Sequence, residues 1–501
     1  MPDLFIDGQW RDASDHGQRE VRCPADGSVV ATVSEATAAD ALDAVRAARR
    51  AFDDGSWPTT PVTERSALLS KLADELEANA DHVAKLEALD TGKRFVEAQG
   101  DIADVISVFR YYAALALADA GKVVDPGQEN VVSRIVYEPV GVCSLITPWN
   151  FPLLQTSWKV APAIAAGNCF VLKPSELTPS TAIWLMRTLT ELGLPDGVGN
   201  LVLGAGSVVG PALTEAPEVD LVSFTGGLAT GKSIMASAAG TVKKLALELG
   251  GKNPNVVFAD ADFEAAVDNA LTAVFLDSGQ VCSAGTRLII EESIHDDFVA
   301  ELVRRAATIR VGGPFDDDAE TGPLISKAHR EKVEAYVAAG IADGATLLVG
   351  GARPEGERYE NGYFYLPTIL GDCTSEMSCV QDESFGPVLT IETFSGETRD
   401  AAEDAAVALA NDTIYGLAGA VWTSDGGRGE RVAARLRHGT IWINDFHPYV
   451  PQAEWGGFKQ SGIGRELGHA GLDEYREAKH IWQNTKPAPG YWFGSEEKGN
   501  R

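Results

Sequence analysis

Basic residues are scarce in this chain. It carries 42 Lys plus Arg against 72 Asp plus Glu among 501 residues, so its formal net charge is −30. A nucleic-acid-binding surface needs a basic stripe to contact phosphates, and a field this negative repels the phosphate backbone. We therefore expect no nucleic-acid partner.

Cysteine and histidine are also sparse. The six cysteines include no C-x-x-C pair and are too few for a disulfide framework in so long a chain, so free thiols in a reducing compartment are expected. The eight histidines are scattered, without an H-E-x-x-H motif, and we therefore predict no metal site.

Long uninterrupted hydrophobic runs are missing as well. The stretch 139–158 has no charged residue, but Pro139, Pro148 and Pro152 would break a spanning helix repeatedly, so it is interpreted as buried core. The acidic start at residues 1–7 does not resemble a secretory signal. We expect a cytoplasmic protein with no membrane partner.

Apolar residues make up 45% of the chain, enough for large cores, and the length favours about two to four domains.

A hairpin is predicted at 4–10, a helix starting at Thr37, and amphipathic helical runs at 64–88 and 95–118. From Val131 short apolar runs alternate with helical patterns, which predicts an α/β fold with parallel sheets wrapped by helices. The predicted strands are 142–146, 169–172, 200–203, 221–224 and 245–249, with helices at 153–166, 179–192 and 229–239. A second α/β pattern restarts after Asp260 with 286–290, 296–309 and 389–394, an added strand is expected at 480–483, and 487–501 is expected to be frayed.

Three short segments look suited to a nucleotide. The glycine-containing stretches 204–210 and 224–231 each follow a strand and open a helix, which suits phosphate, although each is also an ordinary tight turn. Lys173 and Glu176 follow a strand at the edge where open α/β sheets bind ligands. Lys173 can donate to a ribose hydroxyl, while Glu176 would accept from a 2′-hydroxyl and repel a 2′-phosphate. This pair favours NAD, or is a solvated turn.

Two side chains are candidates for covalent chemistry. Glu248 interrupts an apolar strand, where a carboxylate is costly, so it either has a structural partner or uses a raised pKa for acid–base work. Cys282 lies in a polar, glycine-containing turn before a strand, unlike the apolar surroundings of Cys143 and Cys169. That position favours a reactive thiol, whereas a packed bystander is the alternative.

Seven motifs extend these observations over the chain: 145–152 (LITPWNFP), 173–176 (KPSE), 224–226 (FTG), 247–251 (LELGG), 279–282 (GQVC), 383–387 (ESFGP) and 459–462 (KQSG). Their order and approximate spacing resemble those of the NAD(P)-dependent aldehyde dehydrogenase superfamily over essentially the whole chain. The stretch 443–449, together with 455–459, resembles more narrowly the betaine aldehyde dehydrogenase branch.

The resemblance implies a role for each matching residue. Cys282 would be the nucleophile, Glu248 the general base and Asn150 the oxyanion donor. NAD would be the cofactor, held by residues of the family pattern: Ile146, Thr147, Pro148, Trp149, Lys173, Glu176, Gly226, Gly227, Leu249, Glu383 and Phe385. The aldehyde would form a thiohemiacetal, lose hydride to NAD and leave a thioester that Glu248 hydrolyses through water.

The substrate implied by the narrower resemblance is a small aldehyde with a quaternary ammonium group, first betaine aldehyde and second an omega-aminoaldehyde. An aromatic box for the cation would be formed by Phe151, Trp158 and Trp455, with Tyr449 or Phe446 as a further wall. Phe151 stands where the box commonly has tyrosine, and Leu276 where some members have another tryptophan. Glu454 could add negative charge or point to solvent.

The resemblance also implies an architecture: a Rossmann-like NAD-binding domain (1–120 and 142–250), an α/β catalytic domain (251–450) and a β bridging arm with a tail (121–141 and 475–501). In the family this arm completes a neighbour's sheet, which implies a homodimer or homotetramer. Two alternatives remain at this point, a CoA-acylating dehydrogenase and a catalytically silent binding homologue. The intact Cys282, Glu248 and Asn150 disfavour both.

Overall fold

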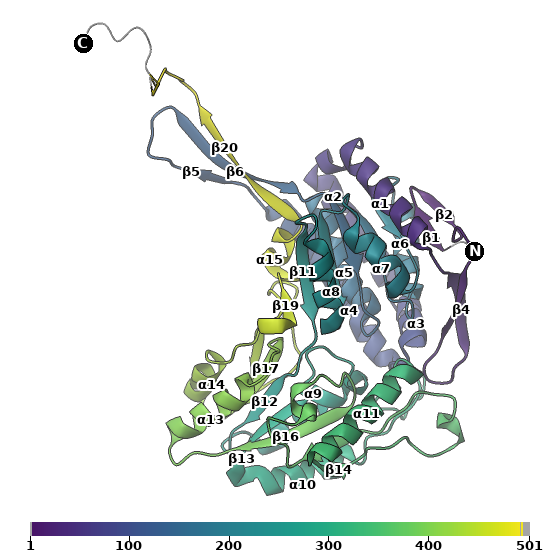
Figure 1. Ribbon diagram of the computed structural model, residues 1–501, viewed down its shortest axis with the longest axis vertical. Helices are drawn as coiled ribbons and strands as arrows, with labels where there is room; N and C mark the ends of the chain where they lie inside the picture. Colours follow the sequence, from purple (N-terminus) through teal and green to yellow (C-terminus); the bar gives the residue numbers. More distant parts are fainter. Residues whose placement is uncertain (1–2, 491, 494–501) are drawn as a thin grey trace.

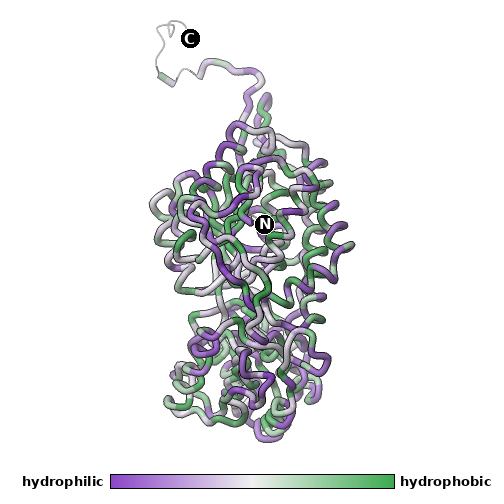
Figure 2. The backbone as a smooth tube through the Cα atoms, turned by 90° about the vertical axis from the view of Figure 1, so that its right-hand side faces the viewer, coloured by the Kyte–Doolittle hydropathy of each residue, from purple (hydrophilic) through white to green (hydrophobic). Residues whose placement is uncertain are grey.

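Two α/β lobes and a projecting arm make up the molecule (Figure 1). The computed structural model describes residues 3–490 and 492–493, so the tail predicted to fray, 487–501, lies largely outside the described residues. Within these residues, none of the helices combines the length and the apolar character needed to cross a membrane. Hydrophobic and hydrophilic stretches alternate along the chain in both lobes (Figure 2).

The first lobe is built on an eight-stranded sheet. Its spatial order is β19 (Gly462–Ile463), β11 (Lys244–Leu249), β10 (Leu221–Gly226), β7 (Val142–Ile146), β8 (Cys169–Lys173), β9 (Gly199–Leu201), β1 (Leu4–Ile6) and β2 (Gln9–Arg11). The five strands from β11 to β9 are parallel. The chain enters at β7, moves outward through β8 and β9, and then returns to the other side of β7 at β10. This reversal creates a crevice between the carboxyl ends of β7 and β10, where open α/β sheets bind ligands.

Helices cover both faces of this sheet (Figure 1). They are α1 (Ala38–Asp53), α2 (Val62–Ala78), α3 (Ala80–Thr91), α4 (Phe95–Ala118), α5 (Pro152–Ala166), α6 (Ser180–Glu191), α7 (Gly206–Glu215) and α8 (Leu228–Ala238). The predicted start at Thr37 is confirmed, because its hydroxyl accepts from Asp40 N and the Asp40 carboxylate accepts from Thr37 N. The single helical run expected at 64–88 is wrong. Asn79 (φ −116°, ψ 18°) leaves helical geometry and its side chain donates to Glu75 O, so the run divides into α2 and α3.

The second lobe contains a seven-stranded sheet. Its spatial order is β14 (Thr346–Val349), β15 (Thr368–Gly371), β16 (Val388–Phe394), β13 (Arg287–Glu291), β12 (Pro254–Val257), β17 (Ala418–Trp422) and β18 (Thr440–Ile443), all parallel except β14. Its helices are α9 (Phe263–Phe275), α10 (His295–Ala306), α11 (Lys327–Asp343), α12 (Ser378–Gln381), α13 (Arg399–Asn411) and α14 (Gly426–Ala433). A continuous buried cluster joins the lobes, with Leu145 of β7 and Leu288 of β13 among its members.

The arm is a three-stranded antiparallel sheet that projects from the first lobe (Figure 1). Its strands are β5 (Lys122–Val124), β6 (Val131–Pro139) and β20 (Arg476–Asn484), and α15 (Gly468–Asp473) leads into the last of them. The strand predicted at 480–483 is confirmed as part of β20. Strands β3 (Gln18–Arg22) and β4 (Val29–Ser34) form a separate hairpin. Where domain boundaries divide this chain stays a prediction.

Candidate active site

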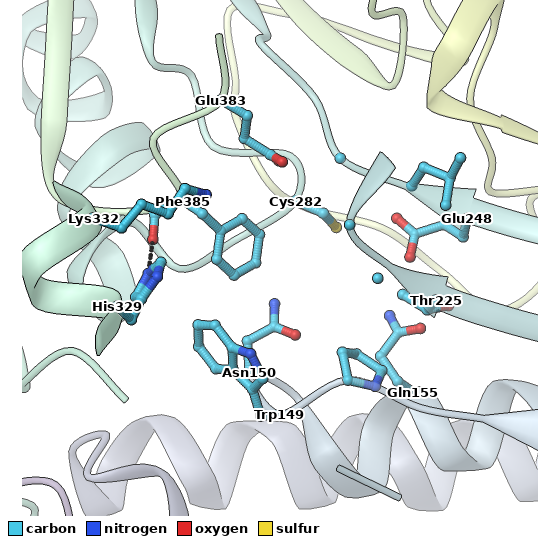
Figure 3. Close-up of a pocket in the computed structure, with 15 residues that line it drawn as sticks. Trp149, Asn150, Gln155, Thr225, Glu248, Cys282, His329, Lys332, Glu383 and Phe385 are labelled. Atoms are coloured by element: carbon cyan, nitrogen blue, oxygen red, sulfur yellow. Dashed lines mark hydrogen bonds between the residues drawn. The ribbon is translucent and has the colours of Figure 1, made fainter. Parts of the chain in front are cut away.

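The three residues expected to carry chemistry meet in one cavity between the lobes. Cys282 lies between α9 and β13, Glu248 lies near the end of β11, and Asn150 follows β7. All three line a space of about 220 Å³, called here the catalytic cavity, and their side chains point into it (Figure 3). Residues distant in sequence are therefore close enough to act on one small molecule.

Cys282 is the cysteine with access to a cavity. Its side chain is partly exposed, whereas the other five cysteines are buried: Cys23, Cys143, Cys169, Cys373 and Cys379. The polar turn around it in the sequence was therefore a useful signal, because it separated this thiol from those in apolar strands.

Backbone geometry fixes the turn that carries this thiol. Asp277, Ser278 and Gly279 have consecutive left-handed φ values of 46°, 54° and 70°. A Cβ on Gly279 would lie 2.2 Å from Gly386 O, so only glycine fits there. Below the turn, the Asn253 amide donates to Cys282 O at 2.9 Å. Three left-handed residues are unfavourable unless the surroundings hold them, and such strain is concentrated at functional sites.

Glu248 is buried beside the Cys282 thiol, and neither of its carboxyl oxygens has a hydrogen-bond partner among the described residues. Burial raises the pKa of Glu248 to about 7. Burial, and then the nearby Glu248 carboxylate, also raises the pKa of the Cys282 thiol well above its usual value. Of the two interpretations left open by the sequence, the perturbed acid–base group fits this geometry, since Glu248 has a pKa near neutral pH and lines the same cavity as the nucleophile candidate.

The Asn150 side chain is held in a fixed orientation. Its Nδ2 donates to Gln280 O at 2.8 Å, which leaves the second N–H of the amide free of that bond. The Gln280 side chain is itself anchored, because Ile325 N donates to its Oε1 at 2.8 Å. An amide donor held in advance at a cavity wall can stabilise negative charge without reorganising.

A second, larger cavity of about 760 Å³ occupies the crevice between β7 and β10, and we call it the cofactor cleft. Lys173 Nζ donates to Glu176 Oε2 at 3.1 Å on one wall. Gly227 forms the N-terminal end of α8 without a side-chain cap, so the first backbone N–H groups of the helix face the cleft. Eight predicted cofactor residues line it: Ile146, Thr147, Pro148, Trp149, Lys173, Glu176, Gly226 and Gly227.

The other three predicted cofactor residues, Leu249, Glu383 and Phe385, line the catalytic cavity. Gly251 N donates to Glu383 Oε1 at 2.9 Å, and burial raises the pKa of Glu383 to about 7. The cleft and the catalytic cavity share Trp149, Gly226 and Gly227 as lining residues, so a long ligand could lie in both. The residues present therefore fit a dinucleotide.

A third cavity, of about 420 Å³, reaches Cys282 from a different direction, and we call it the aldehyde cavity. Its walls include the predicted aromatic residues Phe151, Trp158, Tyr449 and Trp455. Phe446 and Leu276 line it as well. The Trp158 ring centre lies 5.5 Å from that of Tyr449 and 6.0 Å from that of Trp455. Glu454 is exposed and is not among the residues that line this cavity.

The lining residues that the sequence analysis missed include four with titratable side chains: Asp101, Asp104, His329 and Lys332. Asp101 and Asp104, both on α4, line the aldehyde cavity, and the Tyr449 hydroxyl donates to Asp104 Oδ2 at 2.9 Å. The available signal was an acidic residue on the buried face of an apolar helix. His329 and Lys332, both on α11, line the catalytic cavity, and nothing in their local sequence distinguishes them.

His329 supports the backbone of Phe385. Its Nε2 donates to Phe385 O at 2.7 Å, and its ring lies 5.3 Å from that of Trp149 (Figure 3). Burial lowers the pKa of His329 to about 4, so the ring is neutral at physiological pH. Phe385 has a φ of +54°, which bulky side chains rarely adopt, and this hydrogen bond helps to hold it.

Known proteins match this chain over nearly its full length. The family model described as "Aldehyde dehydrogenase family" matches residues 10–481. A betaine aldehyde dehydrogenase of Bacillus subtilis (strain 168) is 56% identical over 98% of this chain and 99% of its own length. An aminoaldehyde dehydrogenase of Pisum sativum is 41% identical over 99% of this chain and 98% of its own length. A crystal structure of a Staphylococcus aureus betaine aldehyde dehydrogenase in complex with NAD+ superimposes with a TM-score of 0.96 at 49% identity, covering 99% of this chain and 97% of that one.

The fold expected from the seven motifs is thereby confirmed at the level of the whole chain. A model match across most of the sequence and relatives above 30% identity over nearly full length agree with the two-lobed α/β architecture. The chain belongs to the aldehyde dehydrogenase family.

Proposed function

We propose that this aldehyde dehydrogenase oxidises betaine aldehyde to glycine betaine with NAD, through a covalent intermediate on Cys282. The observation that carries the proposal is that Cys282 lines both the catalytic cavity, which is continuous in its lining with the cofactor cleft, and the aldehyde cavity. An aldehyde and a dinucleotide entering from different sides would meet at this sulfur.

For each chemical step the proposal assigns a residue. The Cys282 sulfur, as thiolate, attacks the aldehyde carbon, and the free Asn150 N–H stabilises the oxygen that becomes negative. NAD, when bound, supplies the hydride acceptor and a positive charge that favours the thiolate. Glu248 then takes a proton from a water molecule that attacks the thioester, and carboxylate is released. Because the pKa of Glu248 is about 7, the ionised base is available at mildly alkaline pH.

The walls of the aldehyde cavity support a cationic substrate. Aromatic faces attract a quaternary ammonium by about 0.5 to 2 kcal/mol each, depending on desolvation. Asp101 and Asp104 add negative charge to the same cavity. The trimethylammonium group of betaine aldehyde cannot donate hydrogen bonds, so aromatic ring faces and negative charge are what recognise it.

A second candidate substrate is an omega-aminoaldehyde. Its primary ammonium carries three N–H donors, and the carboxylates Asp101 and Asp104 offer acceptors for them. We place it second because the cavity presents more aromatic surface than acceptor groups.

NAD is favoured over NADP by the charge on one wall of the cofactor cleft. Glu176 lies where an adenine ribose would enter, and its pKa is lowered by the nearby Lys173 ammonium, against the effect of burial, so that it stays ionised. A fixed carboxylate there accepts from a 2′-hydroxyl and repels a 2′-phosphate. A CoA-acylating or catalytically silent homologue remains disfavoured, because neither needs the base at Glu248.

Assembly into a homodimer or homotetramer through the arm is likewise a proposal. Val123 on β5 is 85% exposed and Trp482 on β20 is 50% exposed, which leaves apolar surface on a sheet that projects from the body. The cytoplasmic location stays a prediction.

A matched pair of aldehydes tests the substrate. Betaine aldehyde and 3,3-dimethylbutanal have the same shape, but the second has carbon where the first has the charged nitrogen. We expect kcat/KM with NAD to be at least about tenfold higher for betaine aldehyde, which corresponds to about 1.4 kcal/mol. 4-Aminobutanal, NADP and the Cys282→Ala variant complete the panel. Equal values for the charged and neutral aldehydes would remove betaine aldehyde, and NADH formation by Cys282→Ala would remove the covalent route.

A further inference from the structure

A fully buried lysine lies directly behind the wall of the aldehyde cavity. Lys93, between α3 and α4, has a side chain that is 0% exposed. Its Nζ donates to Asp101 Oδ2 at 2.7 Å, lies 3.8 Å from Asp277 Oδ2 and sits 4.0 Å from the centre of the Phe151 ring. An ammonium group is costly to bury unless it is paired, so these contacts determine where it lies.

The three partners of Lys93 belong to two different parts of the site. Asp101 and Phe151 line the aldehyde cavity, where they face the substrate proposed above. Asp277 is the first left-handed residue of the turn that leads to Cys282. Lys93 itself is not among the residues that line the cavity. One ammonium group therefore joins the cavity wall to the turn that carries the nucleophile.

We propose that Lys93 is a positioning residue for substrate selection. Its ammonium group keeps Asp101 charged and fixed in the wall of the aldehyde cavity, and it holds the Phe151 ring in contact with itself. Through Asp277 it also connects both side chains to the turn that carries Cys282. This inference rests on the proposed function, since it concerns selection of a cationic aldehyde. Lys93 acts through its partners and touches neither substrate nor cofactor.

The charges around Asp101 explain why a cation is needed there. Four other carboxyl groups interact electrostatically with Asp101: Glu87, Glu97, Asp104 and Asp277. Lys93 is the cation that contacts Asp101 and Asp277, whereas Arg94 pairs with Glu97 at 3.2 Å. Burial raises the pKa of Asp101 to about 6 although the Lys93 ammonium opposes the rise. Without that ammonium the pKa moves further up, and the ionised fraction of Asp101 falls.

The selectivity of the cavity should change as a result. A charged aldehyde loses the attraction of Asp101, which lines the cavity, together with the weaker repulsion of Lys93, which lies behind it, while a neutral aldehyde of the same shape feels neither charge. Altered kcat, by contrast, affects both aldehydes equally, because they share every chemical step. The ratio of kcat/KM for betaine aldehyde to that for 3,3-dimethylbutanal therefore isolates the role of Lys93 in selection from its role in holding the Cys282 turn.

The test measures this ratio at pH 8 for the parent and for Lys93→Met, Lys93→Gln and Lys93→Arg. We expect it to fall about tenfold in the two neutral variants and to stay within about twofold in Lys93→Arg, which keeps the cation. Asp101→Asn should lower the ratio by a similar factor. The double variant Lys93→Met with Asp101→Asn should lower it no further, because a residue that acts through another gives non-additive effects.

Arg287→Met is the matched control. Arg287 is also a fully buried cation, paired with Glu392 at 2.8 Å on β16, but it lies in the sheet of the second lobe and lines none of the three cavities. Its loss should lower the unfolding temperature and leave the ratio unchanged. A variant that merely loosens the fold would behave in the same way.

Several outcomes would overturn the proposal. One is a ratio in Lys93→Met within twofold of the parent, and another is a further fall in the double variant. A third is that neither neutral variant is obtained folded while Lys93→Arg is, since Lys93 would then serve stability alone. Failure of the proposed function is distinct, because it would appear in the parent as a ratio near one.

Discussion

Replacing Glu248 with glutamine separates the two halves of the proposed reaction. Glutamine has the same shape but cannot accept a proton at neutral pH, and neither oxygen of Glu248 has a hydrogen-bond partner to lose among the described residues. We therefore expect Glu248→Gln to fold normally. Formation of the thioester and of the first NADH should remain, whereas release of the acid should become slow.

The size of the effect follows from the role of the carboxyl. A positioned general base contributes about 10²- to 10⁴-fold, or roughly 3 to 5 kcal/mol, so the steady-state rate should fall by that factor. The pKa of Glu248 is raised to about 7, and only its ionised form is a base. The parent rate should therefore fall about tenfold for each pH unit below about 7, and this inflection should be absent in the variant.

Rapid mixing with detection of NADH fluorescence provides the assay. The variant should show a burst close to one NADH per site, followed by a slow linear phase, at pH 8 and at pH 6. A steady-state rate equal to that of the parent would refute the base assignment. Loss of the burst itself would instead place Glu248 in activation of the Cys282 thiol.

Two further substitutions test the cavity and the turn. Asn150→Ala should lower kcat by about 10²- to 10³-fold, because the amide stabilises the oxyanion. The dissociation constant for NAD, measured by fluorescence titration, should stay unchanged, because the amide does not face the cofactor. A fall in kcat of less than about threefold would contradict this role. Gly279→Ala places a Cβ 2.2 Å from Gly386 O at a φ of +70°, so it should destabilise the protein by about 1 to 3 kcal/mol and lower kcat together with the unfolding temperature. An unchanged unfolding temperature in calorimetry would show that the turn relaxes without cost.

Much of the fold was predictable because strand and helix periodicities in this chain are strong. The start of α1 at Thr37 follows from a local capping box, and the bounds of α4 follow from a long apolar stripe. The division at Asn79 was not predicted, because the same amphipathic pattern continues across it and only packing decides the break. Pairing of β19 with β11 was invisible for a similar reason, since a two-residue strand has no periodicity.

The candidate site likewise contains some residues that the sequence could predict and others that it could not. Cys282 and Glu248 stand out locally, one as a thiol in a polar turn and the other as a carboxyl in an apolar strand, and the motif order supplied the rest of the proposed set. Asp101 and Asp104 depend instead on how α4 lies against the aldehyde cavity, as does the contact that Asp101 makes with Lys93 in the preceding loop. A sequence pattern shows that such charged residues are on the buried face of a helix, but not which cavity or partner receives them.

The short strand β19 sets an order of events during synthesis. Gly462 pairs with Glu248 at the edge of the first sheet, so the strand that bears this carboxyl gains its outer neighbour only after about 210 further residues have been synthesised. At about 5 to 20 residues per second, β11 waits roughly 10 to 40 s with the backbone groups of its outer edge unpaired, while its inner edge pairs with β10. Nascent chains in that interval offer a ready template for intermolecular aggregation.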